Sequence, residues 1–167
     1  MADIYLGLGS NTEPTCYLRM GVKELAREFE LRTVSRAYRN QAVGFEGDDF
    51  LNAVVCVASD RPVEEIAAVL KAIHAKAGRV RGDSAFVSRT LDIDLLLVGD
   101  AVIPEWRIPR RDVLEHSFVL RPLAEIAPDL RHPVTGETMA AHWAACDQET
   151  HPLTEVPLDL LDSIEPA

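Results

Sequence analysis

The segment SRTLDIDLLLVGD, residues 88–100, carries two aspartates within a run of apolar residues. Asp92 and Asp94 are two positions apart, so on a β-strand both side chains would point to the same face of the sheet. Two neighbouring carboxylates are costly to bury unless cations neutralise them. Mg²⁺ suits this pattern because it prefers oxygen ligands, takes one or two protein carboxylates and leaves its other positions to water and substrate phosphates. The pair therefore predicts a magnesium site that handles a phosphate-containing substrate.

A simpler interpretation places the two aspartates at the exposed edge of a short strand, where an arginine pairs with them. The apolar run at 95–98 is instead typical of a central strand, and arginines are frequent on both sides of it. Six of them lie between positions 79 and 111, namely Arg79, Arg81, Arg89, Arg107, Arg110 and Arg111. Because guanidinium groups are forked donors, the cluster favours contacts with phosphate or carboxylate.

The segment from Arg79 to Arg89 reads as a loop with an arginine at each end and Phe86 near its middle. Such a loop could close over a polyphosphate, exclude water and place positive charge against the group being transferred. The alternative is an ordinary solvent-exposed loop, which would be the better interpretation without the neighbouring aspartates.

Other phosphate-binding and metal-binding patterns are missing from the sequence. The segment GLGSNT has Thr12 where a dinucleotide-binding loop needs its third glycine, and no GxxxxGK[ST] motif occurs. Gly9 and Ser10 lie too far upstream of Asp92 for a nucleotidyltransferase pattern. The dispersed histidines and the lack of an HExxH motif argue against a zinc site.

The predicted elements that must position these residues follow the order strand, helix, strand, strand, helix, strand. Strands are expected at 4–8, 31–40, 50–59 and within 88–100, and helices at 17–29 and 61–79. Pro122 and Pro128 punctuate one or two short helices expected within 112–130. The order is that of a split βαβ unit. We therefore expect an α+β, ferredoxin-like fold with a mainly antiparallel sheet and helices packed on its faces.

The length of 167 residues suits one globular domain, which we place at 1–146, followed by an acidic and poorly ordered tail at 147–167. A net charge of −10 argues against binding to nucleic acid through general phosphate attraction. The three cysteines are scattered and favour free thiols in a reducing cytosol. No apolar run reaches membrane-spanning length, so we expect a cytoplasmic protein without a membrane partner.

Five segments together resemble 6-hydroxymethyl-7,8-dihydropterin pyrophosphokinase of folate biosynthesis in their order and spacing. They are YLGLGSN near the start, FLNAV at 50–54, GRVR at 78–81, SRTLDIDLLL at 88–97 and FVLRPLAEIAP at 118–128, and GRVR followed by RTLDIDLL is the most specific. The resemblance implies a ferredoxin-like, monomeric transferase of the kinase type with two small-molecule substrates. Such an enzyme moves the β,γ-diphosphate of ATP to the hydroxymethyl group of the dihydropterin and releases AMP.

By matching position, the resemblance also implies roles for individual residues. Asp92 and Asp94 would hold two Mg²⁺ ions that bridge to the triphosphate, and Arg79 and Arg89 would flank a mobile catalytic loop and contact the phosphates. The pterin would be bound by Asn40, Val43, Phe50, Asn52 and Phe118, with the two phenylalanines stacking on the ring. ATP would be bound by Lys71, His74, Arg81, Phe86, Leu95, Arg110, Arg111 and His116.

Departures from the family pattern gather on the nucleotide side. His74 stands where glutamate is frequent, Phe86 where tryptophan is, Arg110 where histidine is, Arg111 where proline or tyrosine is, and His116 where arginine is. Three interpretations stay open: an active pyrophosphokinase with a rearranged ATP pocket, a paralogue with another pterin or donor, and a pterin-binding module without turnover. A metal-dependent phosphohydrolase that uses the same aspartates is a fourth alternative.

Overall fold

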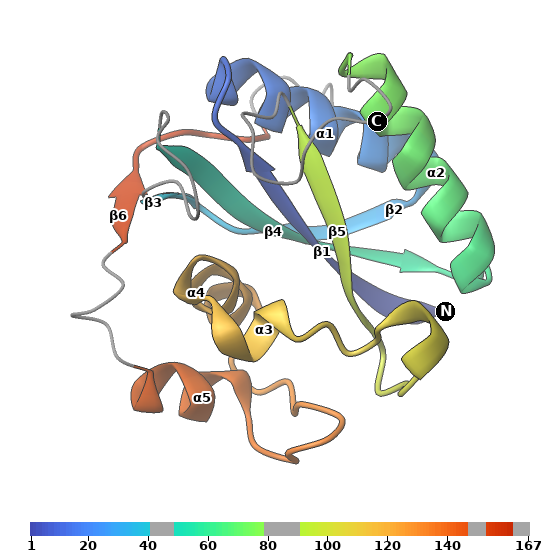
Figure 1. Ribbon diagram of the computed structural model, residues 1–167, viewed down its shortest axis with the longest axis vertical. Helices are drawn as coiled ribbons and strands as arrows, with labels where there is room; N and C mark the ends of the chain where they lie inside the picture. Colours follow the sequence, from blue (N-terminus) through green and yellow to red (C-terminus); the bar gives the residue numbers. More distant parts are fainter. Residues whose placement is uncertain (41–48, 79–90, 147–152, 162–167) are drawn as a thin grey trace.

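Six strands form one antiparallel sheet in the computed structural model, which describes residues 1–40, 49–78, 91–146 and 153–161. The strands are β1 (Ala2–Ser10), β2 (Glu30–Val34), β3 (Ala37–Asn40), β4 (Phe50–Ser59), β5 (Asp92–Val98) and β6 (Thr154–Val156). The helices are α1 (Pro14–Glu28), α2 (Val63–Lys76), α3 (Asp112–Glu115), α4 (Ser117–Ile126) and α5 (Met139–Ala145), with a short 3₁₀ turn at Pro104–Trp106. Figure 1 shows α1 and α2 on one face of the sheet and α3, α4 and α5 on the other.

The strand order is β5-β1-β4-β3-β6, and β2 pairs with β4 beyond the end of β3. Every pairing in the sheet is antiparallel. The two central strands, β1 and β4, are each followed by a helix that returns the chain to an outer position of the sheet, as in a split βαβ unit. The ferredoxin-like α+β prediction is thus confirmed.

The strand expected at 31–40 is divided into β2 and β3 by an irregularity at Ser35 and Arg36. The backbone N–H of Ser35 donates to the carbonyl of Val54 over 2.9 Å, and the hydroxyl of Ser35 accepts from the N–H of Val54, also at 2.9 Å. The serine side chain therefore replaces a ladder hydrogen bond, so both segments can pair with the single strand β4.

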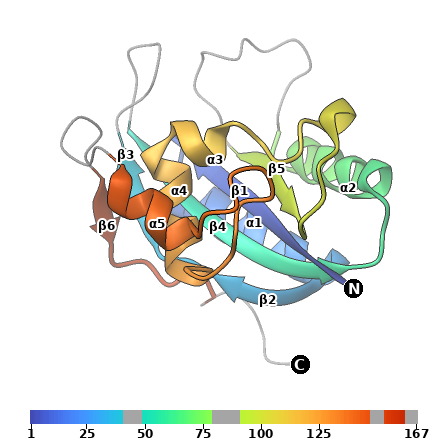
Figure 2. The same cartoon turned by 90° about the horizontal axis from the view of Figure 1, so that it is seen from below.

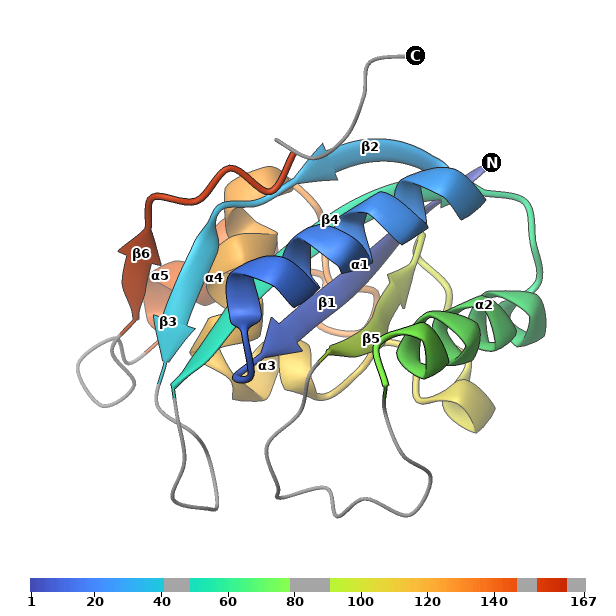
Figure 3. The ribbon, with the colours of Figure 1, turned by 90° about the horizontal axis from the view of Figure 1, so that it is seen from above.

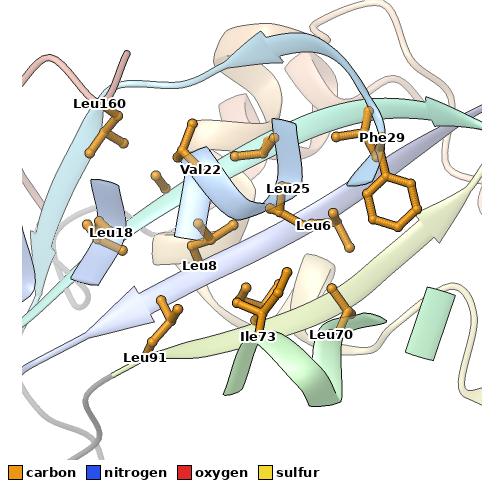
Figure 4. Packing of buried hydrophobic residues seen from close by; sticks show 14 of the residues in the cluster. Leu6, Leu8, Leu18, Val22, Leu25, Phe29, Leu70, Ile73, Leu91 and Leu160 are labelled. Atoms are coloured by element: carbon orange, nitrogen blue, oxygen red, sulfur yellow. The ribbon is translucent and has the colours of Figure 1, made fainter. Parts of the chain in front are cut away.

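The core between the sheet and helices α1 and α2 follows from the alternation of β1. Leu6 and Leu8 point toward this layer and are fully or almost fully buried, as Figure 4 shows. Figure 3 shows both helices lying across this face of the sheet. A methyl group added to Gly21 of α1 would stand 3.0 Å from Leu8, so this glycine permits the close approach of α1 to β1.

A second core lies between the opposite face of the sheet and helices α3 to α5, the layer seen in front in Figure 2. Helix α5 was not predicted. Thr138 begins it as N-cap, and its hydroxyl accepts from the N–H of Ala141. Pro122 lies inside α4 and does not divide it, which also differs from the expected punctuation.

Part of the expected acidic tail is a structural element. β6 pairs antiparallel with β3 at the edge of the sheet (Figure 1), and Leu160 is 3% exposed in the core beneath α1. Val156, Leu158 and Leu160 are spaced two apart and all pack against this core. These contacts fix residues 153–161 against the sheet. The expectation of poor order is wrong for these residues. The rest of the segment lies outside the described residues.

A membrane-spanning helix would need more length and apolar character than any helix in the described ranges has.

Candidate active site

A pocket opens on the α3 and α4 side of the sheet, where β1 ends and β4 and β5 begin. Its walls come from β1, β3, β4, β5, α3 and α4. The polar, aromatic and glycine residues that line it are Gly7, Gly9, Asn40, Phe50, Asn52, Asp92, Asp94, Asp112 and Phe118. The predicted metal residues and four of the five predicted pterin residues are therefore brought together.

The strand register builds the floor of the pocket in rows. Gly9 of β1 lies opposite Asn52 of β4 on one side and opposite Asp92 of β5 on the other. In the next row Gly7 lies opposite Asp94. A methyl group on Gly9 would stand only 3.1 Å from Oδ1 of Asn52, so the glycine leaves open space between the asparagine and the aspartate.

Two asparagines present amide groups at one end of the pocket. Nδ2 of Asn52 donates to Oδ1 of Asn40, which joins β4 to β3 across the pocket wall. Asn52 is only 6% exposed. A buried amide held in one orientation by such a bond presents its remaining donor and acceptor in fixed directions, which suits recognition of the polar edge of a heterocycle.

Phe50 and Phe118 supply the aromatic walls of the pocket, from the start of β4 and from the first turn of α4. The ring of Phe118 stacks on the imidazole of His116, with centroids 4.8 Å apart and planes inclined by 16°. His116 was predicted to contact ATP. It does not line the pocket but supports the ring of Phe118 from outside.

Tyr38 ties together the two elements that carry Asn40 and Phe118. Its hydroxyl, on β3, donates to Oε1 of Glu125 on α4. Burial, followed by the hydrogen bond to Glu125, raises the pKa of Tyr38 to about 12, so the phenol stays protonated as the donor at neutral pH.

The aspartate pair lies on one face of β5, as the spacing predicts, and neither carboxylate is fully buried. The side chain of Asp92 is 29% exposed and that of Asp94 is 33% exposed. Nη2 of Arg110 lies 3.5 Å from Oδ1 of Asp94, and Nε of Arg110 lies 3.5 Å from Oδ2 of Asp112. Asp112 is a pocket residue that the sequence reasoning missed, although its position beside the Arg110–Arg111 pair was a signal that could have found it.

His74 supports the backbone between the two aspartates. Its Nε2 accepts the N–H of Ile93 over 2.9 Å and lies 4.0 Å from Oδ1 of Asp92. Because an acceptor nitrogen carries no proton, the imidazole is in its neutral form in this contact. His74 thus satisfies a donor on the outer edge of the edge strand β5.

The aspartates fit Mg²⁺ by their chemistry and placement. Within 1–40, 49–78, 91–146 and 153–161, no group of three or more histidines, cysteines, aspartates or glutamates is arranged to hold a metal ion. Mg²⁺ needs no such cage, because two carboxylates facing a pocket can hold it together with water and substrate phosphates.

The other residues predicted for ATP lie away from the pocket or outside the described residues. Lys71 is exposed on α2, and Leu95 packs against the core beneath α1 and α2. Arg111 has an 86% exposed side chain that pairs with Glu115 at 2.8 Å. Predictions for Val43, Arg79, Arg81, Phe86 and Arg89 fall outside the described residues.

Comparison with known proteins identifies a family and relatives for this chain. Residues 5–128 match the family described as 7,8-dihydro-6-hydroxymethylpterin-pyrophosphokinase. A Methylorubrum extorquens protein named 2-amino-4-hydroxy-6-hydroxymethyldihydropteridine pyrophosphokinase is 39% identical over 88% of this chain and 95% of its own length. A Pseudomonas aeruginosa protein with the same name is 34% identical over 87% of this chain and 93% of its own length.

Solved structures show the same fold. The Plasmodium falciparum protein HPPK-DHPS, crystallised with SDX-DHP, superposes with a TM-score of 0.67 at 12% identity over 86% of this chain. This chain spans 44% of that one. From the family match and the two bacterial relatives it follows that the chain belongs to the 7,8-dihydro-6-hydroxymethylpterin-pyrophosphokinase family.

Proposed function

We propose that this enzyme transfers the β,γ-diphosphate of ATP to the hydroxymethyl group of 6-hydroxymethyl-7,8-dihydropterin, with release of AMP, in folate biosynthesis. One observation carries the proposal. A single pocket joins an oriented asparagine pair and two aromatic rings to a pair of aspartates. The first set suits a flat heterocycle with a polar edge, and the second suits the metal ions that accompany a triphosphate.

The pterin half of the pocket would place the acceptor. Asn52 and Asn40 would hydrogen-bond the polar edge of the pterin, and Phe50 and Phe118 would stack on its faces, while Val43 is proposed as a further contact. Holding the ring in this way would fix the hydroxymethyl oxygen near the aspartates and convert a collision of two substrates into a step between positioned groups.

The aspartate half would place the donor. Asp92 and Asp94 would hold two Mg²⁺ ions, which when bound would neutralise the charge of the triphosphate. The hydroxymethyl oxygen would form a bond to the β-phosphorus, the bond from that phosphorus to the α,β-bridging oxygen would break, and the hydroxyl proton would pass to water. AMP would leave with the bridging oxygen.

We propose that positive charge from this chain stabilises the transferred group. Arg79 and Arg89 are proposed to contact the phosphates. Further contacts with ATP are proposed for Lys71, His74, Arg81, Phe86, Leu95, Arg110, Arg111 and His116. Among these, Arg110 has the most direct structural support, because it lies 3.5 Å from Asp94, which lines the pocket.

We also propose that the enzyme acts as a cytoplasmic monomer on small molecules, without a nucleic-acid or membrane partner. The net charge of −10 supports the expectation for nucleic acid, since that charge repels phosphates in general. The scattered cysteines support a reducing compartment.

The function is tested by incubating the purified protein with Mg·ATP and 6-hydroxymethyl-7,8-dihydropterin and by separating the nucleotide products by chromatography. We expect AMP that depends on the pterin and on Mg²⁺ and that disappears in Asp92→Ala and Asp94→Ala. Asp100→Ala is the matched control, because Asp100 is an exposed aspartate just beyond the far end of β5. Binding of the pterin without AMP, or formation of ADP in its place, would contradict the proposal.

A further inference from the structure

Arg110 is fixed beside the aspartate pair by its own backbone. Its N–H donates to the carbonyl of Leu96 over 2.9 Å, which ties the residue to β5 near Asp94. The side chain lies between Asp94 and Asp112, which both line the pocket, at 3.5 Å from a carboxylate oxygen of each. Only 31% of this side chain is exposed.

The guanidinium group is held there by charge more than by hydrogen bonds. Nε of Arg110 is buried and has no hydrogen-bond partner within the described part of the chain, although Oδ2 of Asp112 lies 3.5 Å away. A donor left in this state gains when a better acceptor arrives. We therefore expect Arg110 to exchange its carboxylate contacts for hydrogen bonds to the oxygens of a phosphate group.

We propose that Arg110 competes with the divalent cation for Asp94. Arg110 pairs with Asp94 before the substrates bind, and the cation must displace it. The proposal rests on the proposed function, because it requires Asp94 to be a metal ligand. Arg110 would thus act on the metal through Asp94, without touching the reacting atoms. Histidine is frequent at this position in the family. Metal would bind weakly to the enzyme alone and readily with ATP, whose phosphates give Arg110 a new partner.

Titration with Mn²⁺ in the absence of nucleotide tests the proposal, with the free ion measured by its electron paramagnetic resonance signal. Arg110→Gln should bind Mn²⁺ about 2- to 5-fold more tightly than the wild type, the size expected for release of a partly exposed ion pair. Arg110→His at pH 8, where the imidazole is neutral, should show the same gain and serves as a second variant. With a non-cleavable ATP analogue present, the gain should disappear because the phosphates then hold the arginine.

Arg111→Gln is the matched control for metal binding, because it removes the same charge from the next residue, whose side chain pairs with Glu115 at 2.8 Å. Its affinity for Mn²⁺ should equal that of the wild type. An equal gain in Arg111→Gln, or no gain in either Arg110 variant, would overturn the proposal.

Asp94→Asn, alone and combined with Arg110→Gln, separates this inference from the function on which it rests. If Asp94→Asn weakens Mn²⁺ binding while the Arg110 variants do not strengthen it, only the competition is wrong. If Asp94→Asn changes Mn²⁺ binding in neither background, the metal site itself is wrong and both proposals fail.

Discussion

The two faces of the sheet use the same strands for different purposes. On the face toward α1 and α2, β1 contributes Leu6 and Leu8 to a continuous apolar core. On the opposite face the alternate residues are Gly7 and Gly9, which leave room for a pocket. β5 repeats the division, with Ile93 in the core and the aspartates in the pocket. Neighbouring residues on one strand thus serve different purposes: one packs in the core and stabilises the fold, and the next lines the pocket.

The sharpest test of this separation begins with Asp94→Asn. The rate of AMP formation should fall at least about 1000-fold, because Asp94 is proposed to hold Mg²⁺, and loss of such a ligand would cost several kcal/mol of transition-state stabilisation. The free energy of unfolding should change by less than about 0.5 kcal/mol, since the side chain is partly exposed and leaves no cavity. Steady-state kinetics and urea unfolding on one preparation measure both quantities. If the variant lost activity only because it unfolds, the pocket face and the core face would not have separate roles.

The preceding residue should behave in the opposite way. Ile93 is 2% exposed on the core face, so Ile93→Ala should lower the free energy of unfolding by about 2–4 kcal/mol through lost burial and a residual cavity. Urea unfolding checks this value. KM for the dihydropterin, measured where the variant is still folded, should stay within about 2-fold of the wild type because the side chain of Ile93 packs in the core and does not line the pocket.

Gly9→Ala tests the space in the floor of the pocket. The added methyl group would crowd Oδ1 of Asn52 at 3.1 Å, and we expect the Kd of the dihydropterin to rise about 10-fold, in line with the usual cost of overpacking. Fluorescence titration of the pterin measures the change. Gly21→Ala is the counterpart on the core face, and its pterin Kd should match that of the wild type. A similar loss of affinity in both variants would show that the faces are not independent.

The smallest effect is expected for His132, in the layer of the site but away from the pocket. Its Nδ1 accepts the N–H groups of Val134 and Thr135, and burial, with His142 as the second cause, lowers the pKa of His132. The folded state therefore favours the neutral ring. The free energy of unfolding should be constant above pH about 6.5 and should fall below it, until the lowered pKa of the folded state is reached.

Urea unfolding between pH 5.5 and 8 measures this dependence. His132→Gln keeps a hydrogen-bonding side chain that does not titrate, so its curve should be flatter over this interval. An equally steep curve in the variant would assign the dependence to another group.

The parts of the fold that the sequence could predict are those that local pattern decides. The apolar strands β1, β4 and β5, the helical spacing of α1 and α2, and the shared face of Asp92 and Asp94 all depend on short stretches of sequence. The contacts of Arg110 with Asp94 and Asp112, and the pairing of β6 with β3, join segments far apart in the chain. Such contacts depend on strand register and side-chain packing, which cannot be predicted from the periodicity of the sequence.

Two of the residues predicted to contact ATP also show that sequence pattern does not reveal contacts between distant segments. The sequence identified His74 and His116 as unusual, yet only the structure shows that one accepts the N–H of Ile93 and the other stacks on Phe118. Acidic residues such as Asp112 and Glu115 are common in the first turn of a helix, so only the position of Asp112 beside Arg110 and Arg111 could have singled it out.

A crystal structure with Mg²⁺, 6-hydroxymethylpterin and α,β-methylene-ATP tests the central claim most directly, because a methylene group in this analogue replaces the α,β-bridging oxygen and prevents the transfer. We expect metal ions about 2.0–2.1 Å from carboxylate oxygens of Asp92 and Asp94 and bound to the triphosphate. We also expect the pterin beside Asn52 and between Phe50 and Phe118. A triphosphate bound with its metal ions away from both aspartates would contradict the account.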